Sequence, residues 1–416
     1  KIKKDSRFFG LGGTANLWGG VSSYIEKFEM KDRWSKNENL WPFSYGELNN
    51  FYKQVNQKFK FNVKLHNSKN EKKSKSLIQE RSFFANLNPF KFNNINHYHK
   101  SNLLLNAKVD YVNKKKNLTF VTFKKLKIQL SSKKIVICCG GLETNFLILK
   151  SIKNKKLLQA KNKKIVGRYF MDHPKFDMGV AKFNVNSKRF IEQIQLKKNN
   201  NYFYYKGLSL NKKVQEEKKL LNSYVRFEKY RFIELKNKIL KERKNKNIYF
   251  RFSNLIKFFY QILKLYSFKI INQDSKLEKY KITLFNEMVP RKENRITYIK
   301  TKIGNKFIIK YKFSKIEFKT IFLLKKFIEN LKGIEINYKT KITENYIIKN
   351  LKDSSHHMGG TIMGNNYKKS FVNKNLEIHG IRNIFICSTS VFPTSGSANP
   401  TLTLCALASR LSKYIN

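Results

Sequence analysis

The pattern of apolar and polar positions predicts a chain that mixes strands and helices. Residues 107–128 alternate between apolar and polar side chains, which is typical of strands joined in a hairpin. The run KKIVICCGG at residues 133–141 is continuously apolar before two glycines and predicts a short buried strand, and LETNFLILKS after it predicts a helix. Further strands are expected in KITLFNEMV, NRITYIK and NIFICS, and further helices from about Lys315 to Leu331 and after Asn399-Pro400.

Composition indicates a folded protein of more than one domain. With 416 residues, 41% of them hydrophobic, the chain is long enough for two or three domains with a sizeable core. The charge is extreme, since 86 Lys and Arg against 28 Asp and Glu give a formal +58. One interpretation is a polyanion partner such as nucleic acid or an acidic membrane. We favour compositional drift in solvated positions and expect no nucleic-acid partner, because the lysines are spread along the chain and no nucleic-acid motif is present.

The four cysteines indicate neither a disulfide framework nor a zinc site. Cys138, Cys139, Cys387 and Cys405 form no CxxC motif, so a reducing, cytoplasmic location is the default expectation and no metal is expected. No run of 18 or more apolar residues is present, so no membrane-spanning helix is predicted. The chain opens with Lys1 and not Met, so no targeting signal can be read from it.

The C-terminal residues hold the side chains best suited to chemistry. Asn399-Pro400 opens an apolar helical pattern, and the N-terminus of a helix attracts negative charge. The stretch SSHHMGG at residues 354–360 places two histidines beside a glycine pair, and histidine titrates near neutral pH, which suits a general base. Taken alone, each feature also has an ordinary explanation, a plain helix cap and a structural histidine pair. A metal site is a weaker interpretation, because no carboxylate or cysteine lies at ligand spacing.

Five separated segments resemble, in order, those of the glucose–methanol–choline (GMC) family of flavin oxidoreductases. They are the glycine-rich loop GLGGTANLWGG (residues 10–20), NLWPFSYGELNNFYKQV (39–55), KKIVICCGGLETNFLIL (133–149), VGRYFMDHP (166–174), and the C-terminal signature HHMGGTIMG (356–364) with NIFICSTSVFPTSGSANPTLTLCALASRLS (383–412). The second segment looks like that of bacterial sugar-alcohol-type members, and the fourth closely matches V-G-R-x-L-M-D-H-P. The resemblance implies an FAD-dependent enzyme that oxidises a CH–OH group, with a sugar or polyol as a candidate donor.

The resemblance also implies a fold and its division into domains. The family pattern begins with a strand and a G-x-G-x-x-G turn that hold the FAD pyrophosphate, and no such segment is found here, so we expect an incomplete fragment. The expected fold class is α/β, with a Rossmann-like FAD-binding domain built from residues 1–30, 101–172 and 351–416. Residues 31–100 would form a connecting cap segment. Residues 173–350 would form a substrate domain with an antiparallel sheet and helices.

The same resemblance implies which residues do the chemistry. In the family a C-terminal histidine accepts the hydroxyl proton while the hydride moves to flavin N5. Aligning His-x-x-Gly with the pattern H-P-x-G-T places His356 at the catalytic position, with His357 as the runner-up. The second member of the pair falls on Asn399, which can hydrogen-bond the substrate oxygen but cannot be its base. His173 is interpreted as a structural turn residue and not as a second base.

Cofactor contacts are carried over from the family in the same way. The residues expected at the FAD are Gly12, Gly13, Asn16, Trp18, Gly19, Gly20, Val109, Gly140, Gly141, Ser388, Pro400 and Thr401. The free N–H groups at the start of the last helix would face the negative charge of the reduced flavin. For Trp18 the alternative is ordinary core packing.

Two interpretations remain beside this one. A decayed, non-catalytic family member that binds polyanions or membrane is the rival function, and the intact His356 and Asn399 favour the enzyme. Residues 248–271 are broadly apolar with interspersed lysines, which fits either an interfacial membrane helix or a helix buried on two sides. The electron acceptor cannot be assigned from the sequence.

Overall fold

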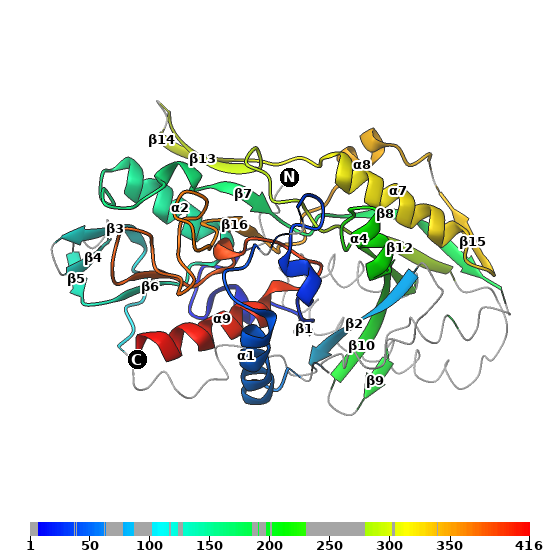
Figure 1. Ribbon diagram of the computed structural model, residues 1–416, viewed down its shortest axis with the longest axis horizontal. Coiled ribbons are helices and arrows are strands. Elements are labelled where there is room, and N and C mark those ends of the chain that lie inside the picture. The colour runs from blue at the N-terminus through cyan, green and yellow to red at the C-terminus, as the bar shows by residue number, and fades with distance from the viewer. Residues whose placement is uncertain are drawn as a thin grey trace, which may run out of the picture.

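The structure is a computed structural model that describes most of the chain (Figure 1). The described residues are 7–36, 38, 40–61, 63, 78–86, 102–115, 118–123, 128–184, 190, 197–199, 202–229, 279–301, 304–338 and 340–416. The segment 248–271, for which a membrane contact was considered, lies outside these residues. Within them, no helix is long and apolar enough to cross a membrane.

Most of the described α-helices begin at a polar side chain that caps them. The α-helices are α1 (Tyr45–Lys58), α2 (Gly140–Lys153), α4 (Lys212–Glu217), α7 (Lys315–Glu329), α8 (Glu344–Asn350) and α9 (Pro400–Ile415). Short 3-10 helices are η2 (Gly13–Asn16), η3 (Lys27–Met30), η7 (Lys163–Ile165) and η9 (Thr389–Val391). Helix α7 has a capping box in which Ser314 and Glu317 satisfy each other's backbone N–H groups. The predicted helices after residue 141, from about Lys315 and after Asn399 are confirmed as α2, α7 and α9.

A large antiparallel sheet forms one part of the molecule. Its strands are β1 (Val21–Ser22), β2 (Ile78–Asn86), β8 (Lys175–Phe183), β9 (Lys197–Asn199), β10 (Tyr202–Leu210), β11 (Tyr224–Lys229), β12 (Lys279–Phe285) and β15 (Ile334–Asn337). They run in the order β1-β2-β10-β11-β12-β8-β15, with β9 beside β10. Helices α7 and α8 lie beside the β8 and β15 side of this sheet (Figure 1). Two of its strands come from before residue 100, so the sheet is not built from residues 173–350 alone.

The second part holds shorter strands and the C-terminal helix. Strands β6 (Ile135–Ile137) and β17 (Ile384–Ile386) pair in parallel, and β3 (Val109–Lys115), β4 (Leu118–Phe123) and β5 (Ile128–Ser132) form an antiparallel sheet against α2. Helix α9 packs on α1, so an early and a late segment of the chain lie side by side (Figure 1). Segments from residues 109–153 and 384–415 are therefore neighbours, as a discontinuous domain requires. The predicted α/β fold class with an antiparallel sheet and helices is confirmed.

A third sheet joins these two parts and determines the geometry of the site. It runs β14 (Gly304–Lys310), β13 (Arg295–Thr301), β7 (Arg168–Met171) and β16 (Met358–Gly360). Strands β7 and β16 are antiparallel, with Met171 opposite Met358. The register shifts between Met358 and Gly360, but continuing it past the pair of Met171 with Met358 directs residues 172–173 toward residues 356–357.

Candidate functional site

Two histidines from distant parts of the sequence meet at the end of β7 and β16. His173 follows β7 and His356 precedes β16, and their Nδ1 atoms are 3.1 Å apart. The rings are nearly perpendicular, with an interplanar angle of 84°. His173 is buried, whereas His356 remains half-buried. The residue interpreted as a turn histidine is therefore a direct partner of the predicted base.

The backbone that carries His356 is held by a buried carboxylate. Asp172 accepts hydrogen bonds from the backbone N–H of Ser354 through Oδ2 (3.0 Å) and of His356 through Oδ1 (2.9 Å). Ser355 between them has a left-handed backbone conformation, with φ 63°. Both oxygens of one carboxylate thus fix the turn that presents His356.

His357 points the other way and has a different environment. Its Nε2 lies 3.1 Å from Asp353 Oδ1, and its ring stacks on Phe170. Its backbone carbonyl accepts a hydrogen bond from Thr389 Oγ1 at 2.6 Å. These contacts bury His357 and give it a structural role, so the geometry supports His356 as the more accessible of the two histidines.

Burial and neighbouring charge change the protonation of this cluster. The pKa of His356 is held well below its ordinary value, first by desolvation and then by His173 and Lys175. Desolvation also raises the pKa of Asp172, while His357 acts to lower it. A lowered pKa keeps His356 neutral at neutral pH, and only the neutral ring can accept a proton.

Three groups in this cluster lie close enough to be considered as metal ligands. Ligand atoms of Asp172, Asp353 and His357 lie within 4.8 Å of one another. However, Asp353 Oδ1 already contacts His357 Nε2 and accepts from the backbone N–H of Ser355, and both Asp172 oxygens accept from backbone N–H groups. Mutual hydrogen bonds account for the cluster, as expected of buried polar groups.

Asn399 is held at the start of α9 by a contact outside this helix. Its Nδ2 donates to the Val21 carbonyl at 3.0 Å, and its side chain does not cap α9. Pro400 occupies the first helical position, so the N–H groups that follow it, beginning with Thr401, have no capping side chain. The expected contact of Asn399 with a substrate oxygen stays a prediction.

The glycine-rich loop is only partly buried. Gly12 has a left-handed conformation before η2, and Asn16 Nδ2 donates to the Leu11 carbonyl at 2.7 Å. Trp18 packs edge-on against Phe61, with ring centroids 5.9 Å apart, which agrees with the core-packing alternative. Leu17 is 61% exposed.

Glycines of the loop and of α2 differ in the space around them. A Cβ at Gly13, Gly19 or Gly140 would meet nothing within 4 Å. A Cβ at Gly141 would lie 2.1 Å from the carbonyl oxygen of His357, so this glycine lets α2 approach the segment that carries His356 and His357 closely. Gly20 has positive φ and ends the loop at β1.

The remaining predicted cofactor residues lie at the edges of β3 and β17. Val109 is half-buried at the start of β3, which packs on α2. Ser388 is buried and uses its Oγ to cap η9, accepting from Ser390 N–H at 3.3 Å. Ser388 therefore has a structural role as the cap of η9, and its contact with the pyrophosphate remains a prediction.

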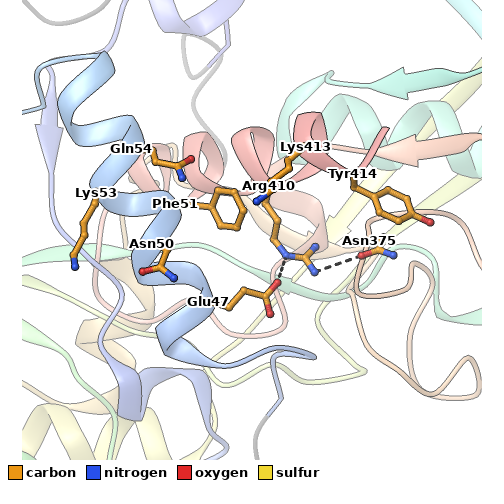
Figure 2. Close-up of a pocket in the computed structure, with 9 residues that line it drawn as sticks. All are labelled: Glu47, Asn50, Phe51, Lys53, Gln54, Asn375, Arg410, Lys413 and Tyr414. Carbon is orange, nitrogen blue, oxygen red and sulfur yellow. Dashed lines mark hydrogen bonds and ion pairs between the residues drawn. The ribbon is translucent and has the colours of Figure 1, made fainter. Parts of the chain in front are cut away.

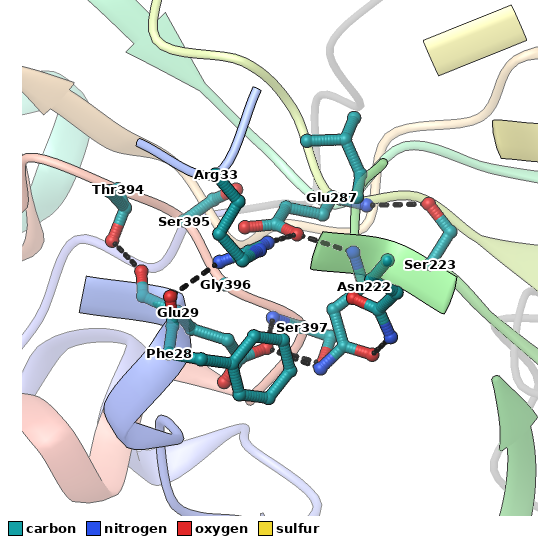
Figure 3. Close-up of polar contacts among 12 residues, drawn as sticks. Phe28, Glu29, Arg33, Asn222, Ser223, Glu287, Thr394, Ser395, Gly396 and Ser397 are labelled. Atoms are coloured by element: carbon teal, nitrogen blue, oxygen red, sulfur yellow. Dashed lines mark hydrogen bonds and ion pairs between the residues drawn. The ribbon is translucent and has the colours of Figure 1, made fainter. Parts of the chain in front are cut away.

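A buried polar network supports the C-terminal segment from behind (Figure 3). Glu29 Oε1 accepts from Ser397 N–H, Ser397 Oγ and Asn222 Nδ2, each at 2.8 Å. Arg33 forms a fully buried ion pair with Glu287, whose Oε2 also accepts from Asn222 N–H. Burial raises the pKa of Glu287, while Arg33 acts to lower it. Sequence patterns did not reveal this network, because it joins residues up to 368 positions apart.

A surface pocket lies away from these residues, between α1 and α9 (Figure 2). It encloses about 700 Å³ and is lined by Glu47, Asn50, Phe51, Lys53, Gln54, Asn375, Arg410, Lys413 and Tyr414. Arg410 is already bonded there to Glu47 and to the Lys374 carbonyl. None of the predicted site residues lines this pocket, so it does not identify the candidate active site.

One family model matches part of the chain. Residues 326–408 match the family model described as GMC oxidoreductase, and this stretch contains His356, Asn399 and the first half of α9. A search among curated proteins finds no match.

Solved structures that resemble the chain are distant in sequence. They include an FAD-dependent oxidoreductase from Chaetomium thermophilum (13% identity, 77% of this chain and 63% of that chain, TM-score 0.42). Pyridoxine 4-oxidase from Mesorbium loti has 12% identity over 74% of this chain and 57% of that chain, with a TM-score of 0.44. A formate oxidase variant from Aspergillus oryzae has 13% identity over 78% and 62%, with a TM-score of 0.45. The chain thus spans less than two thirds of the length of each of these proteins.

Proposed function

We propose that this chain serves an FAD-dependent oxidoreductase that removes hydride from the CH–OH group of a small alcohol or sugar. The observation that carries the proposal is the match of residues 326–408, because this stretch contains His356, a half-buried histidine that contacts His173 and whose pKa burial holds well below its ordinary value. A decayed binding protein would have no need to hold a neutral histidine in this way. The electron acceptor is left unassigned.

The residues present fit an anionic dinucleotide. Gly13, Gly19 and Gly140 leave open space where a side chain would otherwise stand. Helices α2 and α9 both begin without a capping side chain, so their free N–H groups can donate hydrogen bonds to negatively charged oxygens. In our proposal Gly12, Asn16, Trp18, Gly20, Val109, Gly141 and Ser388 complete the binding surface, and residues 1–30, 101–172 and 351–416 form one domain.

The proposed mechanism assigns one task to each residue. Bound FAD supplies the hydride acceptor, flavin N5. His356 takes the hydroxyl proton of the substrate, which general-base catalysis of this kind accelerates by about 10²–10⁴-fold. Asn399 orients the substrate oxygen through its amide. The N–H groups after Pro400 and at Thr401 stabilise negative charge that develops beside them.

Flavin titration tests the cofactor part of the proposal. We expect the chain to quench FAD fluorescence saturably but weakly. Gly13→Asp places a carboxylate into the open space of the loop, and Asp tolerates the left-handed conformation found there, so binding should be lost without unfolding. Gly46→Asp at the start of α1 is the matched control and should bind as the native chain does. No saturable quenching, or equal binding by both variants, would contradict the proposal.

A further inference from the structure

The contacts of His173 determine where its own proton resides. Its Nε2 lies 2.8 Å from the Gly396 carbonyl oxygen and 3.3 Å from that of Ser395. Carbonyl oxygens only accept hydrogen bonds, so Nε2 must carry a hydrogen. The side chain is only 3% exposed, and burial of an imidazolium costs more desolvation than burial of the neutral ring. His173 is therefore a neutral ring with hydrogen on Nε2 and a lone pair on Nδ1.

This lone pair determines the tautomer of His356. The Nδ1 atoms of the two rings are 3.1 Å apart, so one must donate and the other accept. Because His173 Nδ1 has only a lone pair, His356 Nδ1 is the donor. A neutral imidazole has a single N–H, so the lone pair of His356 resides on Nε2.

Both rings are held in place by groups that do not react. The carbonyls that orient His173 belong to the segment that Glu29 fixes through Ser397 (Figure 3). Ser395 Oγ donates to the Met288 carbonyl on the other side. Asp172 fixes the backbone of His356. The pair is thus built from three separate chain segments into a single orientation.

We propose that His173 is a positioning residue that fixes His356 in the tautomer with hydrogen on Nδ1, so that Nε2 is the atom that accepts the substrate proton. The role of Nε2 as a base rests on the proposed function. The tautomer itself does not, because it follows from contacts within the chain.

Nitrogen-15 NMR of the chain labelled at histidine tests the tautomer without flavin or substrate. The chain has seven histidines, and the His356 signals are assigned by their loss in His356→Asn. We expect the shift of an N–H nitrogen at Nδ1 and of an unprotonated nitrogen at Nε2. The reverse assignment in the native chain would overturn the proposal.

Two variants of His173 separate positioning from packing. His173→Phe keeps a ring but removes the acceptor, so His356 should become a mixture of both tautomers. His173→Asn places a side-chain oxygen near the position of Nδ1 and should restore the single tautomer. If His173→Phe folds and His356 keeps its single tautomer, the role of His173 is refuted. If His173→Phe does not fold, the test falls to His173→Asn, and a mixture of His356 tautomers in that variant refutes the role.

Kinetics link the tautomer to the reaction. Flavin reduction is measured with FAD bound and a panel of simple alcohols and hexoses as donors. His173→Phe should slow it by about 10-fold to 100-fold, which is no more than the loss of rate expected when the general base itself is removed. His173→Asn should recover most of this loss. If the NMR result holds but no donor reduces the flavin in the native protein, the proposed function fails while the tautomer assignment stands. If the native protein reacts but His173→Phe reacts equally fast, the positioning role fails.

Discussion

The C-terminal block, residues 351–416, and the glycine-rich loop, residues 10–20, are both predicted from their sequence motifs to serve one site, yet they are held in opposite ways. In the block, His356, His357 and Ser397 are fixed by buried carboxyl groups and backbone carbonyls. In the loop, Gly13 and Gly19 face open space and Leu17 is exposed. A clear sequence motif therefore does not by itself indicate whether its residues are held in place by the surrounding protein.

The difference follows from what each region must do. A base needs a fixed tautomer and a lowered pKa, and both require neighbours that are already in place. A glycine-rich loop serves by leaving room for another molecule's atoms, so its own contacts are few. We expect substitutions to be costly for stability in the block and its supporting network, and to affect ligand binding in the loop.

The largest expected effect comes from the support of the block. Glu29→Ala leaves Ser397 N–H and Asn222 Nδ2 without their buried acceptor, which should lower the free energy of unfolding by about 1–3 kcal/mol for each unsatisfied donor. Leu17→Ser in the exposed loop should change it by no more than about 0.5 kcal/mol. Urea denaturation followed by circular dichroism measures both. Equal losses would erase the difference between the two regions.

The second effect concerns the reaction. His356→Ala should slow flavin reduction by about 10²-fold or more, the lower range for loss of a general base, while His357→Asn should cost far less. Stopped-flow absorbance, normalised to bound flavin, measures the rates. The reverse ranking would show that His357 is the base.

The pH dependence of the same rate checks the environment of His356. Its pKa lies below the ordinary value of 6.5, chiefly because the ring is desolvated, so the neutral form of His356 persists below that pH. The rate limited by this base should therefore be constant above pH 6.5 and fall only at lower pH. An inflection at or above 6.5 would contradict the burial that the structure shows.

Local elements could be predicted from the sequence, and contacts between distant segments could not. The alternation at residues 107–128 and the apolar run before Gly140 predicted β3, β4 and β6, because strand periodicity depends only on neighbouring residues. The pairing of Met171 with Met358 depends on the register between remote strands. His173 could be read from its motif, but its contact with His356, 183 positions away, required that register.

A pair of glycines gives a smaller effect. Gly141→Ala would force a Cβ to within 2.1 Å of the His357 carbonyl, and overpacking of this kind costs about 1–3 kcal/mol. Gly19→Ala meets open space and should leave the stability of the chain almost unchanged. Thermal unfolding compares the two variants. If Gly19→Ala is the more destabilising, the loop is packed more tightly than its exposure indicates.

The smallest effect distinguishes two adjacent cysteines by their contact with the block. Cys387 of the block hydrogen-bonds the Cys138 thiol and lowers its pKa, whereas burial raises the pKa of Cys139 to about 11. The pKa of Cys138 lies below the ordinary thiol value of 9.0, so at neutral pH Cys138 holds at least about 100-fold more thiolate than Cys139. A thiolate of lower pKa is also a weaker nucleophile, which reduces the expected ratio of the two reaction rates to about tenfold. Iodoacetamide should therefore modify Cys138 about tenfold faster, as read by fragment mass spectrometry of the shared peptide. Cys387→Ala removes the donor and should bring the two rates closer together. An unchanged preference in that variant would show that Cys138 reacts because of its exposure and not because of the block.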